Sequence, residues 1–174
     1  MSIIHNQPNQ TDDPLVNEVR SAIEHRATWM YFLMKEARDK GLEWDDFARR
    51  AIRNTGTIHG QRIHEGFEEP TSLEDFEKIF GVGTSRKVFE MEVIQENDQA
   101  YQLDFHYCPL VTAWQKLGVS GEEIQHLCDI AMDGDRGIAA NFPQVEFELG
   151  QTIAQGYPVC QLCFKPKTQS KLSR

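Results

Sequence analysis

The stretch that decides the fold is Phe89–Leu110, which reads FEMEVIQENDQAYQLDFHYCPL. On both sides of Asn97-Asp98 apolar and polar residues alternate, and this period of two predicts an antiparallel hairpin with one apolar and one polar face. A two-residue loop would pair Met91 with Asp104 across the strands and mix the two faces. A three-residue loop pairs apolar with apolar residues, so we expect three loop residues.

Outside the hairpin, the spacing of apolar residues changes to the period of about 3.6 that is typical of helices. Asp13 is expected to cap a first helix that begins at Pro14. The second helix has a less defined end, because Gly56, Gly60 and Gly66 interrupt its pattern. The second helix begins near position 44, and the other predicted elements are helices that begin near positions 71, 109 and 120 and strands over residues 145–149 and 159–164.

This order of elements predicts an α+β fold. An N-terminal helical layer packs on a roughly four-stranded antiparallel sheet, and two helices are inserted between the hairpins. We expect a flexible lead over residues 1–12, a single domain over 13–165 and a loose tail over 166–174. With 174 residues, of which 40% are hydrophobic and 26% charged, the chain has the composition of one globular domain with a core of its own.

The net charge of −9 comes from acidic residues spread along the chain, and this field would repel nucleic acids and anionic membrane surfaces. No apolar run approaches the roughly 20 residues of a membrane-spanning helix, and the polar N-terminus lacks the features of a signal peptide. We therefore expect a cytoplasmic protein that binds neither nucleic acids nor membranes, and a homo-oligomer is compatible with the sequence. Its four cysteines are expected to be reduced thiols.

Cys108 is the first candidate for chemistry because it lies where a strand runs into a helix. Pro109 takes the first helical position, so Cys108 is expected to be the N-cap, where unpaired N–H groups and the helix dipole favour a thiolate. His106 and Asp104 precede it on the strand and could serve as base and orienting group, the general form of a covalent catalyst. The alternative is a solvent-facing polar stripe, since residues two apart on a strand lie about 6–7 Å apart.

Further candidates follow along the chain. Cys128 lies on the apolar side of its helix, where a free cysteine usually behaves as a small hydrophobe. Asp129 and Asp133 are one turn apart and could exchange protons or bind a cation, although a solvated helix face has the same pattern. Cys160 and Cys163 have CxxC spacing, but on a strand their sulfurs face opposite ways, which disfavours a zinc site or a thioredoxin-like motif.

From Tyr107 to Phe164 the chain resembles the L-2-amino-thiazoline-4-carboxylic acid hydrolase family. The matching features, in order, are Cys108-Pro109, Gly118, Cys128-Asp129, Asn141-Phe142-Pro143, Thr152-Ile153-Ala154-x-Gly156 and Cys160. The resemblance implies a small pocket lined by Cys108, Cys128 and Cys160. It adds Thr152 and Asn141 as binding residues and Asp129 or Asp133 as acid or base.

The namesake activity opens a cyclic amidine-like ring by adding water at a C=N carbon. The resemblance therefore implies a small hydrolase that acts on a C–N bond of a cyclic amidine or amide-like molecule, with Cys108 and His106 assisted by one of the two aspartates. Two alternatives remain open. One is a small-molecule-binding or sensor module without turnover, and the other is a thiolate metal site of Cys108, Cys128, Cys160 and His106. The sequence requires no cofactor.

Overall fold

The fold comes from a computed structural model, which describes residues 3–67 and 72–167. Its helices are α1 (Pro14–Asp39), α2 (Asp45–His64), α3 (Leu73–Glu77), α4 (Gly83–Val88), α5 (Pro109–Lys116), α6 (Gly121–Ala131) and α7 (Asp133–Ala139), with a 3₁₀ turn, η1 (Ile153–Gln155). Its strands are β1 (Met91–Glu96), β2 (Tyr101–Phe105), β3 (Val145–Leu149) and β4 (Cys160–Pro166). No helix within the described ranges has the length and apolar character to span a membrane. The tail predicted from position 166 lies outside these ranges from residue 168 onward.

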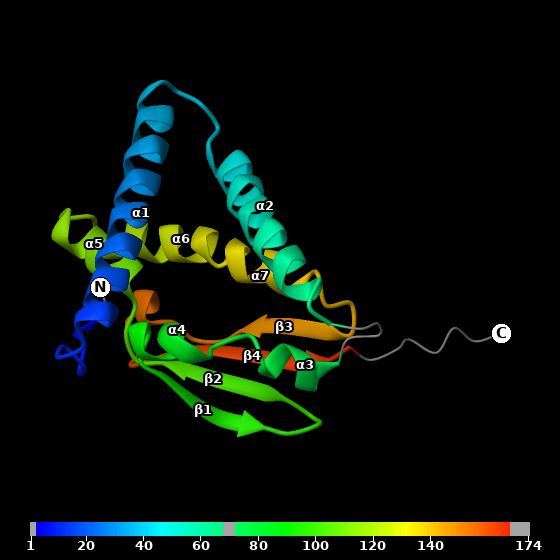
Figure 1. The fold of residues 1–174 in the computed structure, drawn as a ribbon. Coiled ribbons are helices and arrows are strands. Elements are labelled where there is room, and N and C mark those ends of the chain that lie inside the picture. Colours follow the sequence, from blue (N-terminus) through cyan, green and yellow to red (C-terminus); the bar gives the residue numbers. More distant parts are fainter. Residues whose placement is uncertain (1–2, 68–71, 168–174) are drawn as a thin grey trace.

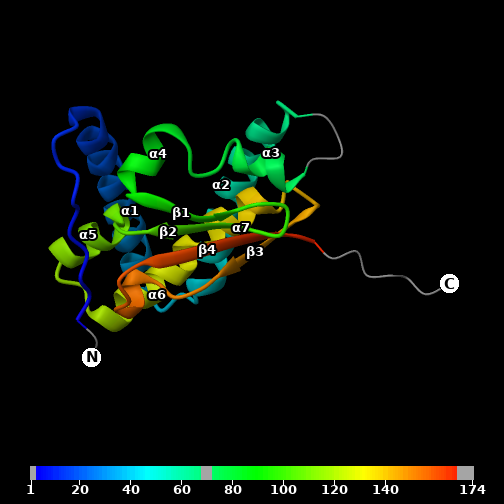
Figure 2. The ribbon, with the colours of Figure 1, turned by 90° about the horizontal axis from the view of Figure 1, so that it is seen from below.

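The four strands form one antiparallel sheet in the order β1-β2-β4-β3. Helices α1, α2, α6 and α7 lie on one side of this sheet (Figure 1). The other side of the sheet faces the viewer in Figure 2. The side chains that the strands bury toward the helices are Tyr101, Leu103, Phe105, Leu162 and Phe164. An α+β fold with a helical N-terminal layer on a four-stranded antiparallel sheet is therefore confirmed.

The hairpin of β1 and β2 pairs apolar with apolar residues, as the sequence predicts, but its loop is longer than expected. Met91 lies opposite Phe105, and a β-bulge after Val93 shifts the register so that Glu96 pairs with Tyr101. Residues 97–100 therefore form a four-residue loop. The expectation of three loop residues was wrong because the bulge absorbs one extra residue while the buried face keeps its pairing.

Helices α2 and α7 pack with their backbones almost in contact because glycines stand where they cross. A Cβ atom on Gly56 would lie 2.0 Å from the carbonyl oxygen of Gly134, and one on Gly137 would lie 2.3 Å from that of Arg53. The glycines of α2 therefore do not end this helix, which continues to His64. Gly134 likewise lies inside α7, a third inserted helix where the sequence predicts two.

Residues 3–12 make specific contacts with the rest of the chain, although the sequence predicts a flexible lead there. Asn6 is buried, and the backbone N–H groups of Asn9 and Gln10 donate to the carboxylate of Glu90. That carboxylate also pairs with the buried Arg20 at 3.0 Å. Glu90 has a φ of +50°, so this network surrounds a backbone conformation that non-glycine residues rarely adopt.

Candidate functional site

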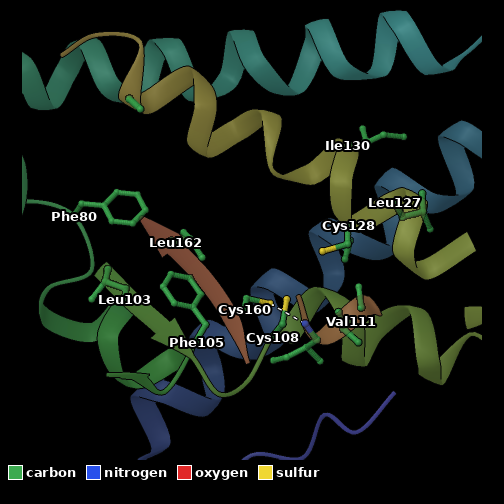
Figure 3. Packing of buried hydrophobic residues seen from close by; sticks show 14 of the residues in the cluster. Phe80, Leu103, Phe105, Cys108, Val111, Leu127, Cys128, Ile130, Cys160 and Leu162 are labelled. Carbon is green, nitrogen blue, oxygen red and sulfur yellow. Dashed lines mark hydrogen bonds between the residues drawn. The ribbon is translucent and has the colours of Figure 1, made fainter. Parts of the chain in front are cut away.

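Three of the four cysteines bring their thiols together in the core. Cys108 precedes α5, Cys128 lies in α6 and Cys160 begins β4, and all three are buried. The sulfur atoms of Cys108 and Cys160 lie side by side, and Cys128 stands on the side of α6 that faces them (Figure 3). Strand pairing explains this approach, because Cys160 is the register partner of Phe105, three residues before Cys108. We call these three residues the thiol cluster.

Cys108 is the N-cap of α5, as the sequence predicts, with an extended backbone and Pro109 at the first helical position. The side chain of Asn6 holds this residue from both sides. Its Oδ1 atom accepts a hydrogen bond from the N–H of Cys108 at 2.9 Å, and its Nδ2 atom donates to the carbonyl oxygen of Cys108 at 2.9 Å. The N-terminal segment therefore fixes the backbone that carries the first thiol.

The thiols of this cluster are protonated near neutral pH, which overturns the expectation of a stabilised Cys108 thiolate. Burial raises the pKa of Cys108, and the N–H groups of Val111 and Leu110 at the start of α5 only partly oppose it. Burial likewise raises the pKa of Cys160 to about 12, and that of Cys128 well above its ordinary value. The helix N-terminus acts in the predicted direction, but desolvation is the larger effect.

Asp135, in the first turn of α7, is a site residue that the sequence reasoning missed. Burial raises the pKa of its carboxyl to about 6, and this carboxylate is electrostatically coupled to Cys108, Cys128 and Cys160. A carboxyl that titrates near neutrality is suited to acid–base chemistry. The sequence offered one signal, an aspartate directly after Gly134 and two positions past Asp133.

Asp129 and Asp133, the carboxylates predicted as acid or base, are instead held in ion pairs. Arg49 of α2 contacts Asp129 at 2.8 Å and Asp133 at 3.1 Å, and Arg136 contacts Asp129 at 3.1 Å. Burial alone would raise the pKa of Asp129, but the hydrogen bonds from Arg136 and Arg49 outweigh it and lower that pKa. This network ties α6 and α7 to α2 and favours the ionised carboxylate of Asp129.

His106 lies on the polar face of the sheet and does not join the thiol cluster. Its Nε2 atom is 3.0 Å from a carboxylate oxygen of Glu92, its neighbour on β1. Asp104 stands on the same face, opposite Gln161. Cys163 is partly exposed on this side of β4, so the two sulfurs of the CxxC spacing do face opposite ways. Among the residues that the structure describes, no three His, Cys, Asp or Glu side chains are arranged to hold a metal ion.

Thr152 and Asn141, predicted as binding residues, both make local structural hydrogen bonds. The hydroxyl of Thr152 accepts from the N–H of Gln155 and so caps η1. The side chain of Asn141 donates to the carbonyl oxygens of Thr57 and Gly137, which attaches the end of α7 to α2. Thr152 also lines an open groove of about 460 Å³, together with Glu122, Gln125, His126, Asp129, Leu149 and Gln155.

The fold has a counterpart among solved structures. A solved structure of a trafficking protein particle complex subunit 3 from Naegleria fowleri, covalently bound to palmitic acid, is similar with a TM-score of 0.54. The two sequences are 16% identical, and the likeness covers 83% of this chain and 95% of that one, so it shows a shared fold. No curated protein matches the chain.

The sequence profile of one family matches residues 20–164, which include the helices α2 to α7, most of α1 and the thiol cluster. The match is wider than the segment from Tyr107 to Phe164 that carries the resemblance, and it spans most of the 174 residues. The chain therefore belongs to the L-2-amino-thiazoline-4-carboxylic acid hydrolase family.

Proposed function

We propose that this protein is a small hydrolase that opens a C–N bond of a cyclic amidine or amide-like molecule. The observation that carries the proposal is the thiol cluster together with Asp135, a nearby carboxyl whose pKa of about 6 lets it accept a proton at neutral pH and return it. The family is named for a hydrolase of a 2-amino-thiazoline, a cyclic amidine, which supports the substrate class of the proposal.

Cys108 is the nucleophile in this proposal, although its thiol is protonated at rest. A protonated nucleophile attacks when a neighbouring base takes its proton, as hydroxyl nucleophiles do. The Sγ atom of Cys108 bonds to the amidine carbon while its proton moves to the carboxylate of Asp135. The C–N bond then breaks, and the leaving nitrogen takes that proton from Asp135.

Water completes the cycle. It attacks the carbon bound to Cys108, one of its protons returns the sulfur to the thiol form, and the product leaves with the oxygen. The net reaction consumes one substrate and one water and needs no redox partner. Cys128 and Cys160 line the apolar surroundings of Cys108, where exclusion of bulk water strengthens the interaction between Asp135 and the reacting atoms.

The test is an incubation of the purified protein with a panel of cyclic amidines and small amides, read by mass spectrometry for the addition of water. The wild type should convert at least one member, and Cys108→Ser should lower the rate at least roughly 100-fold. Cys163→Ser is the matched control, because Cys163 lies on the other face of β4. Turnover that survives in Cys108→Ser would show that Cys108 is not the nucleophile. An absence of turnover by the wild type would contradict the proposed hydrolase activity.

A second candidate is a binding module that carries a ligand on Cys108 without turnover. The observation in its favour is that Cys108 belongs to the hydrophobic core cluster, beside Phe105 and Val111, and so has the apolar surroundings that suit an acyl group (Figure 3). The similar trafficking subunit is covalently bound to palmitic acid. Intact-mass measurement before and after hydroxylamine distinguishes the two, because a thioester adds mass that hydroxylamine removes.

A further inference from the structure

Helix α1 carries apolar side chains on two opposite faces, and the rest of the protein covers one of them. Val16, Ala27 and Met34 face the core and are buried. The exposed apolar residues follow helical spacing along the opposite side of the helix and are Leu15, Ala22, Trp29, Phe32 and Leu33. Trp29 and Leu33 are 63% and 67% exposed. We call this side the outer face of α1, and an exposed apolar surface of this kind marks an interaction site.

Trp29, in the middle of the outer face, is held in place before any partner binds. Its indole N–H donates to the Nε2 atom of His25 at 2.9 Å, and the two rings meet edge to face with centroids 5.8 Å apart. A side chain that is already oriented loses little conformational entropy on association. Tryptophan is also enriched among the residues that dominate interface energies. The C-terminal half of α1 stands away from the sheet, so a second helix has room to approach it (Figure 1).

The charged side chains of α1 divide into a paired set and an unpaired set. The ion pairs are Arg20 with Glu90, Glu24 with Lys116, Lys35 with Asp39 and Arg38 with Glu123. Glu18, Arg26 and Glu36 form no ion pair with any residue in the two ranges that the structure describes, and all three are exposed on the outer face. Arg26 lies three residues before Trp29, and Glu36 lies three residues after Leu33. The apolar centre of the face therefore has an unpaired cation at one end and an unpaired anion at the other.

This arrangement is complementary to itself. When two copies of α1 pack antiparallel about a twofold axis at the level of Tyr31, positions equally far before and after Tyr31 face each other across the axis. Trp29 and Leu33 lie two residues on either side of Tyr31, so the indole of each copy meets the leucine of the other. Arg26 and Glu36 lie five residues on either side, so each unpaired cation meets an unpaired anion. One symmetric contact thus satisfies both the apolar centre and the two charges.

We propose that the outer face of α1 is the interface of a homodimer, in which the α1 helices of two copies pack antiparallel. The 26 residues of α1 make a helix about 39 Å long, and packing along it can approach the roughly 800 Å² per partner that stable interfaces bury. The pairing of Arg26 with Glu36 favours a second copy over a membrane surface, because a lipid bilayer offers no such alternation of charge and the net charge of −9 opposes anionic lipids. This proposal does not depend on the proposed hydrolase activity.

The first test is sedimentation velocity of the full chain over a concentration series from about 1 to 100 μM, the range in which micromolar dimers dissociate. The wild type should be a dimer at the upper end of the series. Trp29→Glu should raise the dissociation constant at least roughly 30-fold, because it places a carboxylate in the apolar centre of the interface. Ile94→Glu is the matched control, since Ile94 is a half-exposed apolar residue on β1, and it should dimerise as the wild type does. Circular dichroism checks that both variants are folded.

The second test examines the antiparallel register by reversing charges. Arg26→Glu and Glu36→Arg each bring like charges together at both ends of the interface, so each variant alone should dimerise roughly 10-fold more weakly than the wild type. An equimolar mixture of the two variants should recover the wild-type affinity, because every charge contact in the mixed dimer joins opposite charges.

A wild type that stays monomeric at the highest concentration overturns the proposal, and so does a dimer that Trp29→Glu leaves unchanged. Charge-reversal variants that fail to recover when they are mixed would contradict the antiparallel pairing of Arg26 with Glu36. Binding of a monomeric wild type to vesicles of phosphatidylcholine would assign the outer face to a lipid surface and would equally overturn the dimer.

Discussion

The backbone N–H of Ile153 donates a hydrogen bond to the Sγ atom of Cys160 over 3.2 Å. The local sequence explains this contact, because Thr152 caps η1 and Gly156 ends it with a φ of +90°. The motif Thr152-Ile153-Ala154-x-Gly156 thus forms a turn whose first N–H meets the thiol cluster. Its threonine has a structural role, and its effect on the site passes through Cys160.

Alkylation of the native protein should label Cys163 before the three thiols of the cluster. Burial raises the pKa of all four cysteines, but Cys163 alone among them is partly exposed. Peptide mapping after a short iodoacetamide pulse at pH 8 measures the order. Fast, selective labelling of Cys108 below pH 7 would contradict the pKa direction and restore the thiolate that the sequence predicts.

The close packing of α2 on α7 predicts opposite effects for two glycines of one helix. Gly137→Ala places a Cβ atom 2.3 Å from the carbonyl oxygen of Arg53, and the overpacking should lower the free energy of unfolding by at least about 2 kcal/mol. Gly134→Ala meets only Ile52 at 3.7 Å and should be neutral or stabilising by up to about 1 kcal/mol. Urea unfolding of both variants checks this, and equal effects would argue against the backbone contact.

The buried pair of Arg20 and Glu90 should matter more than an exposed pair of the same chemistry. Glu90→Ala leaves Arg20 buried without its carboxylate and should cost about 3 kcal/mol or more. Glu148→Ala removes the exposed partner of Lys165 and should cost less than about 1 kcal/mol. Thermal unfolding of the two variants gives the comparison, and a similar loss in both would show that the N-terminal network adds little.

Asp135 should destabilise the native state at neutral pH but not in acid. Its folded pKa is raised, so well below the unfolded pKa of 3.8 both states hold the proton and the residue costs nothing. As the pH rises from about 4 to 6 the unfolded state loses the proton first, and the stability falls. A pKa of about 6 in place of 3.8 corresponds to at most about 3 kcal/mol. Asp135→Asn should therefore gain stability over the wild type between pH 4.5 and 7.5, whereas a difference independent of pH would contradict the raised pKa.

Much of the fold could be predicted from local patterns. Asp13 and Cys108 are the helix caps that the sequence indicates, and the strand Val145–Leu149 has the predicted bounds. The glycines of α2 were read as breaks because their function, contact with a helix some 80 residues away, is not local. The four-residue loop was missed for a related reason, since a bulge restores the register that sequence parity alone appears to require.

The site was predicted only in part, and the reason is again physical. The thiol cluster follows from the resemblance and from the pairing of β2 with β4. The charge state of Cys108 could not be predicted, because desolvation depends on what packs over the helix start. Which aspartate can act as the acid–base group depends on Arg49, a residue of a distant helix. Arg49 pairs with Asp129 and Asp133 but not with Asp135.

The most direct test of the central claim is the pH dependence of kcat/KM for ring opening in the wild type and in Asp135→Asn. If Asp135 accepts the proton of Cys108, the wild-type profile rises with pH around a pKa of about 6, where its carboxyl ionises. Asp135→Asn should lose that rise and about 100-fold or more of the rate, while Asp133→Asn, in the Arg49 network, keeps the rise. A profile that still rises around pH 6 in Asp135→Asn, at nearly the wild-type rate, would contradict the account.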